Sequence, residues 1–214
     1  EGRSIFNMKI YFTRHGETLW NLEHRFQGWK DSELTENGVK RAELLGKKFN
    51  DIKIDKIFTS PIKRAKRTAY LIKGDKDIEV EEVEGLKEIS FGKWEGMTTE
   101  EIKSHDEYVN ELDNLFNKPF SYKSFEGENI KDFTERLFKT VDDIVKNNED
   151  KDILIVTHGM CVRYLIGYFK NEFEESKIID YPIFHQASYN EVEWNGENFE
   201  VITLNNIDHY EYDK

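Results

Sequence analysis

Short apolar runs alternate with longer amphipathic segments along most of the chain. Runs of a few residues rich in Ile, Val, Phe, Tyr or Leu predict strands, at 8–13, 54–59, 78–83 and 152–157. Segments with apolar residues three or four apart predict helices, at 35–50, 61–72, 98–116, 127–147 and 159–169. Strands that alternate with helices predict an α/β fold, a three-layer sandwich with a mostly parallel central sheet flanked by helices.

Turn and capping residues mark the ends of several predicted elements. Ser60 is a suitable N-cap, and Pro61 suits the first position of the helix that follows it. Asn195-Gly196 predicts a hairpin turn between two late strands, at 189–194 and 199–204. This hairpin would add two strands to the sheet after the last long helix.

Length and composition favour one domain. The chain has 214 residues, of which 37% are hydrophobic and 35% charged, and no linker rich in Pro, Gly or Ser divides it. We expect a single domain over residues 8–214, with a helical cap-like insertion at about 97–127. Met8 is a suitable initiator, and residues 1–7 are interpreted as a remnant that does not belong to the fold.

Charge and cysteine content limit the partners and the compartment. The formal charge of −12, with no long basic run, argues against nucleic acid or an anionic membrane as a partner. The single Cys161 cannot form an internal disulfide, which fits a reducing cytosol. Because no apolar stretch reaches the length of a membrane span and no signal peptide opens the chain, we expect a cytoplasmic protein.

Residues suited to binding an anion follow three of the predicted strands. Arg14 and His15 follow the first, Ser60 and Arg64 the second, and His158 the strand at 152–157. Ligands of open parallel sheets bind beyond the carboxyl ends of the strands, where helix N-termini add free N–H groups. Two arginines and two histidines in one pocket suit a dianion, and phosphate is the main candidate because guanidinium groups bind its oxygens in pairs.

A histidine among cations also suggests covalent chemistry. Neutral imidazole is a nucleophile at phosphorus, and nearby positive charge would keep the attacking nitrogen of His15 unprotonated. His158, if protonated, would stabilise charge on the transferring phosphoryl group. The leaving alkoxide needs a proton, for which Glu88 in the loop at 85–96 is the candidate, with Glu95 behind it.

Four blocks of residues, in order along the chain, resemble the histidine phosphatase (phosphoglycerate-mutase-like) superfamily. The first comprises Arg14-His15-Gly16-Glu17-Thr18, Asn21, Gln27-Gly28, Asp31, Leu34-Thr35 and Gly38. The others are Ser60-Pro61 with Arg64-Ala65 and Thr68-Ala69, Leu86 to Gly96 with Glu88, and Thr157-His158-Gly159. The resemblance runs from residue 8 to about 165 and implies a phosphoglycerate-mutase-like fold.

The resemblance implies a role for each matching position. His15 would become phosphohistidine, while Arg14, Arg64 and His158 would hold the phosphoryl oxygens, and Glu88 would protonate the leaving oxygen and then activate water. Asn21, Gln27 and Gly28 complete the set expected to bind phosphate or substrate. Members of the superfamily need no metal, and we expect this chain to need neither a metal nor a cofactor.

The resemblance leaves the reaction and the substrate open between alternatives. Cofactor-dependent phosphoglycerate mutases of the superfamily carry paired arginines and a lysine in the insertion after the Trp-Glu-Gly loop, whereas this chain has no Arg between Gly96 and Gly127. Hydrolysis of a small phosphorylated metabolite is therefore favoured over the mutase reaction. The chain most resembles α-ribazole phosphatases and broad-specificity phosphatases, and the sequence does not separate the two.

Two further alternatives concern the class of protein and its assembly. A phospho-ligand binding module without turnover would be expected to lose the nucleophile or the acid, and this chain keeps His15 and Glu88. Aromatic residues between Tyr108 and Phe125 are interpreted mainly as core, with one or two lining a substrate-facing cap. The sequence leaves open whether the chain forms a homodimer.

Overall fold

A computed structural model describes residues 7–211, while residues 1–6 and 212–214 lie outside the described residues, as does nearly all of the predicted remnant at 1–7. The sheet has the strand order β3-β2-β4-β1-β5-β6. The strands are β1 (Met8–Arg14), β2 (Lys56–Thr59), β3 (Glu79–Glu82), β4 (Ile153–Thr157), β5 (Tyr189–Trp194) and β6 (Phe199–Asn206). The first four are parallel and the last two antiparallel, which confirms the mostly parallel sheet.

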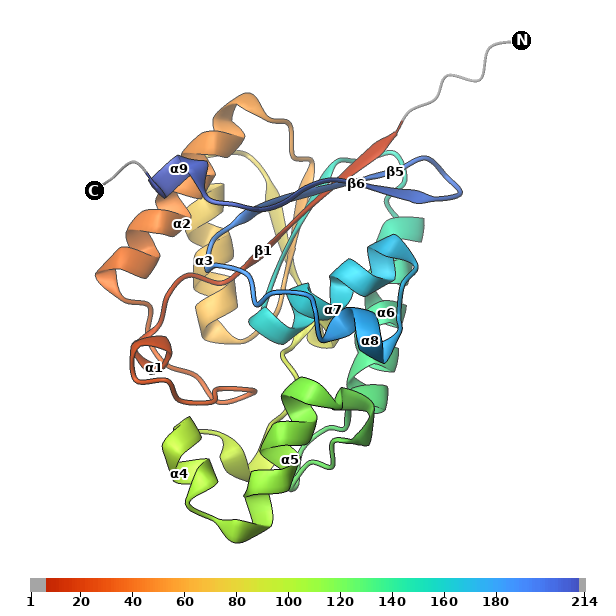
Figure 1. Cartoon of the computed structure of the whole chain (residues 1–214). Helices are drawn as coiled ribbons and strands as arrows, with labels where there is room; N and C mark the ends of the chain where they lie inside the picture. The colour runs from red at the N-terminus through yellow and green to blue at the C-terminus, as the bar shows by residue number, and fades with distance from the viewer. Residues whose placement is uncertain (1–6, 212–214) are drawn as a thin grey trace.

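Helices cover both faces of this sheet (Figure 1). The first face carries α2 (Glu36–Lys48) and α3 (Lys63–Lys73), and the second carries α6 (Ile130–Lys146) and α7 (Gly159–Lys170). Side chains along β1 alternate between two hydrophobic clusters: Tyr11 packs on the side of α2 and α3, and Ile10 and Phe12 on the side of α6 and α7. The predicted three-layer sandwich is therefore confirmed.

Three predicted helices have clearly different bounds in the structure. The helix predicted at 127–147 begins only at Ile130 and ends at Lys146. The helix predicted at 61–72 begins at Lys63 with Ile62 as its N-cap residue, because the Ser60 hydroxyl bonds His158 instead and accepts only the Ile62 N–H locally. The segment predicted as one helix at 98–116 forms two, α4 (Thr99–Lys103) and α5 (Asp106–Asn117). The two helices are separated at Ser104 and His105, where the backbone of His105 is extended (φ −103°, ψ 114°).

Shorter features also differ from the predictions. Asn195 and Gly196 belong to a four-residue connection, in which the Asn195 side chain accepts the N–H groups of Glu197 and Asn198. Three short helices were not predicted: α1 (Leu19–Leu22), α8 (Glu175–Ile178) and α9 (Asp208–Glu211). The remaining single turns are η1 (Phe49–Asp51), η2 (Glu84–Leu86), η3 (Gly92–Trp94) and η4 (Pro119–Ser121).

The segment at 97–127, called the cap below, lies beyond the carboxyl ends of the parallel strands (Figure 1). Trp94 is fully buried at its base, with its ring against those of Tyr108, Tyr122 and Phe125. Most of the aromatic residues of the cap thus extend the core, as the sequence indicated. No helix among residues 7–211 is both long enough and apolar enough to cross a membrane.

Candidate active site

Three neighbouring strands bring the predicted anion-binding residues to one edge of the sheet. β4 lies between β2 and β1, with Thr157 paired to Arg14 and Val156 paired to Thr59. The His15 N–H donates to the Thr157 carbonyl at 2.9 Å, which carries the ladder one residue beyond β1. Arg14, His15, Ser60 and His158 therefore meet at the carboxyl ends of parallel strands, as predicted.

The imidazole of His15 is held in one tautomer. Its Nδ1 lies 2.7 Å from the Gly16 carbonyl, which can only accept, so Nδ1 carries the proton and Nε2 keeps a lone pair. The Arg64 Nε donates toward that Nε2 at 3.3 Å. Burial, together with the charges of Arg64 and Arg14, holds the pKa of His15 well below its usual range. His15 thus presents an unprotonated Nε2 to the cavity.

Arg64 is fixed in place by the loop that follows α1. Its guanidinium donates to the Lys30 carbonyl at 2.6 Å, the Gly28 carbonyl at 2.7 Å and the Asp31 carboxylate at 3.2 Å. Gly28 has a positive φ of 56°, and a Cβ on it would lie 2.5 Å from the Glu95 carboxylate. Only glycine fits there without displacing Glu95, so the predicted contribution of Gly28 is made by its carbonyl and its backbone shape.

Two further nitrogens at this edge are buried without a hydrogen-bond partner among the described residues, Arg14 Nε and His158 Nδ1. Arg14 is anchored through its terminal nitrogen, which donates to the Phe184 carbonyl at 2.9 Å. Gly159 leaves room for this guanidinium, since a Cβ on it would lie 3.1 Å from Arg14 Nε. Buried polar groups are nearly always paired, so these nitrogens are suited to an anionic ligand.

His158 differs in one respect from the sequence-based hypothesis. Its Nε2 lies 2.8 Å from the Ser60 hydroxyl. Burial and the charge of Arg64 hold the pKa of His158 well below its usual range, so the ring is neutral near pH 7. In the protein alone it is thus a hydrogen-bonding group rather than the cation considered above.

Glu88 is separated from the two acids that compete with it in the sequence. It is only 6% exposed, and its carboxyl accepts the N–H groups of Ile89 and Met160 at 2.9 and 3.0 Å. Burial raises its pKa above the usual carboxyl range. Glu95 instead accepts backbone N–H groups at residues 29, 30 and 91, and Glu84 pairs with a surface lysine.

Asn21 and Gln27 line the cavity with their side-chain oxygens already occupied. Thr18 donates its N–H to the Asn21 oxygen at 3.0 Å, and Ser32 donates its hydroxyl to the Gln27 oxygen at 2.9 Å. The Thr18 hydroxyl lies 3.1 Å from both amide oxygens and donates its one proton to either of them. With the oxygens engaged, the amide NH2 group is the part of each side chain left to donate to a ligand.

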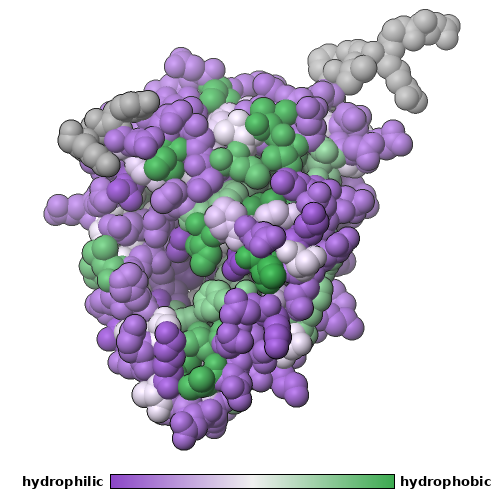
Figure 2. Space-filling view, viewed as in Figure 1, coloured by the Kyte–Doolittle hydropathy of each residue, from purple (hydrophilic) through white to green (hydrophobic). Residues whose placement is uncertain are grey.

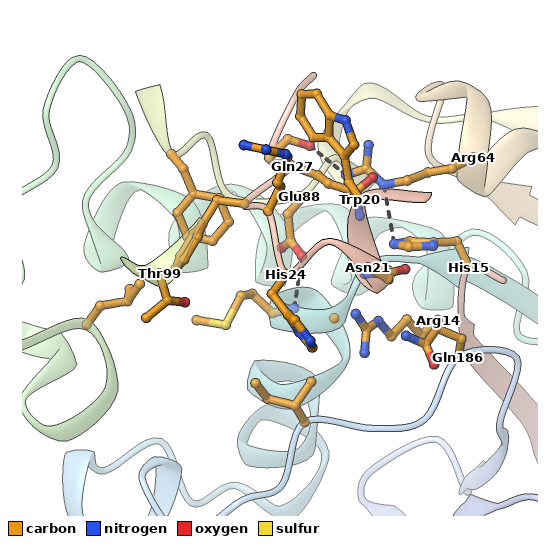
Figure 3. Close-up of a pocket in the computed structure, with 18 of the residues that line it drawn as sticks. Arg14, His15, Trp20, Asn21, His24, Gln27, Arg64, Glu88, Thr99 and Gln186 are labelled. Carbon is orange, nitrogen blue, oxygen red and sulfur yellow. Dashed lines mark hydrogen bonds between the residues drawn. The ribbon is translucent and has the colours of Figure 1, made fainter. Parts of the chain in front are cut away.

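Seven of the eight predicted site residues line one cavity of about 440 Å³ (Figure 3): Arg14, His15, Asn21, Gln27, Gly28, Arg64 and Glu88. The eighth, His158, is fully buried and does not line the cavity, although its neighbours Gly159 and Met160 do. Leu115 and Phe116 also line the cavity, in agreement with the expectation that one or two residues of the segment at 108–125 face the substrate. Sequence reasoning did not identify the other lining residues: Trp20, His24, Arg25, Phe26, Phe91, Thr99, Gly159, Met160, Ile183 and Gln186. They come from α1, from the start of α7, from loops and from the cap, and no short motif encodes how these segments meet. Within residues 7–211, no group of three or more His, Cys, Asp or Glu side chains is arranged to hold a metal ion.

Comparison with known proteins places this geometry in a family. The model of the histidine phosphatase superfamily (branch 1) matches residues 10–207. Phosphoserine phosphatase 1 of Hydrogenobacter thermophilus is 30% identical over 73% of each chain. A phosphoglycerate mutase of Schizosaccharomyces pombe is 32% identical over 73% of this chain and 77% of its own.

Solved structures agree with this placement. YhfR of Bacillus stearothermophilus superposes with a TM-score of 0.90 at 36% identity, covering 95% of this chain and all of its own. The α-ribazole phosphatase of Shigella flexneri has a TM-score of 0.84 at 23% identity, over 94% and 97% of the two chains, and shows the same fold. The chain belongs to the histidine phosphatase superfamily, branch 1.

Proposed function

We propose that this protein is a phosphomonoesterase that hydrolyses small phosphorylated metabolites through a phosphohistidine at His15. One observation carries the proposal: the Gly16 carbonyl fixes the His15 tautomer so that an unprotonated Nε2 faces the cavity, 3.3 Å from Arg64 Nε. A buried, neutral imidazole beside two arginines is poised to attack phosphorus and has little use in a passive binding module. The retained carboxyl of Glu88 also speaks against the alternative of binding without turnover.

The reaction has two balanced steps. In the first, His15 Nε2 forms a bond to phosphorus, the ester P–O bond breaks, and Glu88 gives its proton to the departing oxygen. Arg14 and Arg64 neutralise the phosphoryl oxygens, while His158 donates a hydrogen bond through Nδ1. In the second step, the Glu88 carboxylate removes a proton from water, which attacks phosphorus and releases phosphate and neutral His15.

The protonation states of Glu88 and His15 support these roles. Desolvation favours the protonated form of Glu88, which is the form that a general acid needs. The same burial, with two neighbouring arginines, favours the neutral form of His15. The two arginines supply the positive charge, and the proposed mechanism requires neither a metal nor a cofactor.

Hydrolysis is proposed over the mutase reaction because of the charges on the cap. The cap residues that line the cavity are Thr99, Leu115 and Phe116, none of which is cationic. A mutase must also hold the second phosphate or carboxylate of its intermediate, which needs further cations. Candidate substrates are therefore simple phosphate monoesters, with a broad range or α-ribazole phosphate as the two possibilities for the natural role.

The experiment compares His15→Ala with His105→Ala, which removes an exposed histidine outside the cavity. We expect His15→Ala to abolish hydrolysis of p-nitrophenyl phosphate and His105→Ala to keep it. A phosphoryl group stable to base and labile to acid should be trapped on the peptide containing His15. Unchanged turnover in His15→Ala would refute the mechanism, and interconversion of 2- and 3-phosphoglycerate stimulated by bisphosphoglycerate would favour the mutase.

A further inference from the structure

The cavity has two chemically different halves. Figure 3 shows His15, Arg14 and Arg64 at one end and Thr99 at the other. The half away from His15 is formed largely by apolar side chains from the loop at 85–96, the cap and the start of α7: Phe91, Leu115, Phe116 and Met160. Hydrophobic surface also adjoins the hollow on the side of the cap in the space-filling view (Figure 2).

The charged groups of the second half are already compensated. Arg25 is the only arginine or lysine that lines the cavity besides Arg14 and Arg64, within the described part of the chain. It donates to Glu23 at 2.6 Å, to Glu101 at 3.1 Å and to the Gly96 carbonyl at 2.7 Å. This leaves the exposed His24 as the remaining ionisable side chain of this half. A second anionic group on the substrate would thus find no uncompensated arginine or lysine there.

The consequences for a substrate are opposite for charged and uncharged leaving groups. A carboxylate placed against Phe116 and Met160 would lose its hydration without gaining an ionic partner, which costs binding free energy. An aromatic ring in the same place would remove apolar surface from water and contact other rings. The polar groups of the phosphoryl end are the same for both substrates, so the leaving group alone decides the preference.

We infer that this half of the cavity is a binding site for an uncharged, apolar or aromatic leaving group. The inference rests on the proposed function and names its substrate class: phosphate monoesters of uncharged alcohols, in preference to esters whose alcohol carries a carboxylate or a second phosphate. O-phosphoserine and phosphoglycerate fall in the disfavoured class.

The test uses two esters that differ by one carboxylate on the ring, benzyl phosphate and 4-carboxybenzyl phosphate. We expect kcat/KM to be at least about tenfold higher for benzyl phosphate, the ratio that about 1.4 kcal/mol of differential binding gives. Thr99→Lys adds a cation to the apolar half and should narrow that ratio severalfold. Val109→Lys is the matched control, because Val109 is 41% exposed on the same cap and does not line the cavity.

Each outcome bears on one of the two claims. A ratio near one, or a ratio that Thr99→Lys leaves unchanged, would overturn the assignment of this half. Failure to hydrolyse either benzyl ester while p-nitrophenyl phosphate is turned over would overturn it too, with the proposed function intact. Equal p-nitrophenyl phosphate turnover by wild type and His15→Ala would instead refute the proposed function.

A second, independent observation concerns the support of Glu88. The Arg136 guanidinium, on α6, donates to the Gly85 and Lys87 carbonyls at 2.9 Å each and to the Glu88 carbonyl at 3.2 Å. Its remaining donors form a two-point pair with the Glu128 carboxylate at 2.8 and 2.9 Å. One guanidinium thus holds three carbonyls of the loop that carries Glu88.

Glu128 holds the other side of the same loop. Its carboxylate accepts the Ser90 N–H at 2.9 Å, and its own N–H donates to the Ser90 carbonyl at 2.8 Å. Neither Arg136 nor Glu128 lines the cavity. The pair therefore fixes the backbone before and after Glu88 without touching a bound substrate.

We propose that Arg136 and Glu128 are positioning residues for Glu88. Proton transfer needs the carboxyl within hydrogen-bond reach of the leaving oxygen, and a displacement of about 1 Å can cost on the order of a hundredfold in rate. Lysine at 136 would keep the charge but could not bond three carbonyls and a carboxylate together. The loop would then move relative to the ester oxygen.

The test compares kcat/KM for two substrates whose leaving groups differ in their need for a proton from Glu88. The p-nitrophenolate ion departs without a proton, whereas a benzyl alkoxide needs one, so loss of the acid lowers kcat/KM for benzyl phosphate far more. We expect Glu88→Gln to raise the ratio of the p-nitrophenyl to the benzyl rate by roughly a hundredfold or more. Arg136→Lys should raise it by at least about tenfold, and Glu128→Gln should raise it too.

Arg163→Lys is the matched control, because Arg163 also bonds backbone carbonyls, at residues 178 and 179, far along the chain from Glu88. A substitution that only lowers the amount of folded protein reduces the p-nitrophenyl and benzyl rates equally and leaves their ratio unchanged. This is the result that we expect for Arg163→Lys. An unchanged ratio in Arg136→Lys beside a raised one in Glu88→Gln would overturn the positioning role. An unchanged ratio in Glu88→Gln itself would refute the acid role in the proposed function.

Discussion

The hydrogen bond between Ser60 and His158 offers the sharpest single test of the site. The Ser60 hydroxyl accepts the Ile62 N–H at 3.3 Å and lies 2.8 Å from His158 Nε2. We assign the Ser60 proton to Nε2, because the hydroxyl has no other acceptor among the described residues. This assignment places the imidazole proton on Nδ1, the nitrogen without a partner among those residues. Ser60 therefore selects the tautomer that would donate to a phosphoryl oxygen.

Ser60→Ala removes this bond with almost no change in volume. Ser60 and His158 are fully buried, so the substitution leaves Nε2 unpaired, at a cost of about 2 kcal/mol of unfolding free energy. For a chain of this length that corresponds to a fall in Tm of about 4–8 °C. If the bond biases the tautomer by about 1 kcal/mol, its loss lowers kcat/KM roughly fivefold.

The assay pairs thermal unfolding with hydrolysis of p-nitrophenyl phosphate, and Ser188→Ala serves as the control. Ser188 is also fully buried, and its hydroxyl bonds the Asn190 amide, which keeps two carbonyl acceptors when the hydroxyl is lost. We expect Ser188→Ala to cost less stability and to keep kcat/KM. The reasoning on the tautomer would be refuted if Ser60→Ala kept full kcat/KM, whatever its Tm.

Three further outcomes follow from the same geometry. Gly28→Ala places a residue with a side chain at a positive φ and brings its Cβ against the Glu95 carboxylate. We expect the free energy of unfolding to fall by at least about 2 kcal/mol, which thermal unfolding would show as a Tm lowered by about 4 °C or more. The lowered pKa of His15 and the raised pKa of Glu88 predict a bell-shaped kcat/KM profile with its optimum on the acidic side of neutral. Glu88→Gln should remove the fall of kcat/KM on the alkaline side of this profile. A wild-type kcat/KM that rises steadily above pH 7 would contradict the assignment of Glu88 as the acid. EDTA should leave kcat/KM unchanged, because the proposed cations are Arg14 and Arg64; strong inhibition would point to a metal.

The phosphoryl end of the site was predictable because its residues belong to regular elements. Arg14 is the last residue of β1, and Ser60 and His158 directly follow β2 and β4. The pairing of the parallel strands fixes where these strand ends lie. Arg64 is the second residue of α3, so its direction depends on little more than where that helix starts. The error at that start, with Ile62 and not Ser60 as the N-cap residue, did not move Arg64 away from the site.

The leaving-group end was not predictable in the same way. Its walls come from the loop after β1, the loop at 85–96, the cap and the start of α7. These segments meet through long-range contacts such as the hydrogen bond from the Phe26 N–H to the Met97 carbonyl. No local periodicity encodes such a contact. The break between α4 and α5 comes from one extended residue, His105, and the apolar spacing of the segment continues across it. The choice of the acid among Glu84, Glu88 and Glu95 likewise depends on which carboxyl is buried at the cavity, and the sequence alone does not show this.

Burial sets the protonation state of each ionisable group in the site, and the result is a net charge matched to phosphate. His15 and His158 become neutral and Glu88 favours its protonated form, each with desolvation as the main cause. Burial lowers the pKa of Arg14 to about 10, which still leaves it charged at pH 7, and Arg64 keeps its charge beside Asp31. The groups lining the phosphoryl end thus present two positive charges to a dianion, on a chain whose formal charge is −12. Because the rest of the cavity adds no uncompensated arginine or lysine, a second anionic group on the substrate would exceed what the site neutralises.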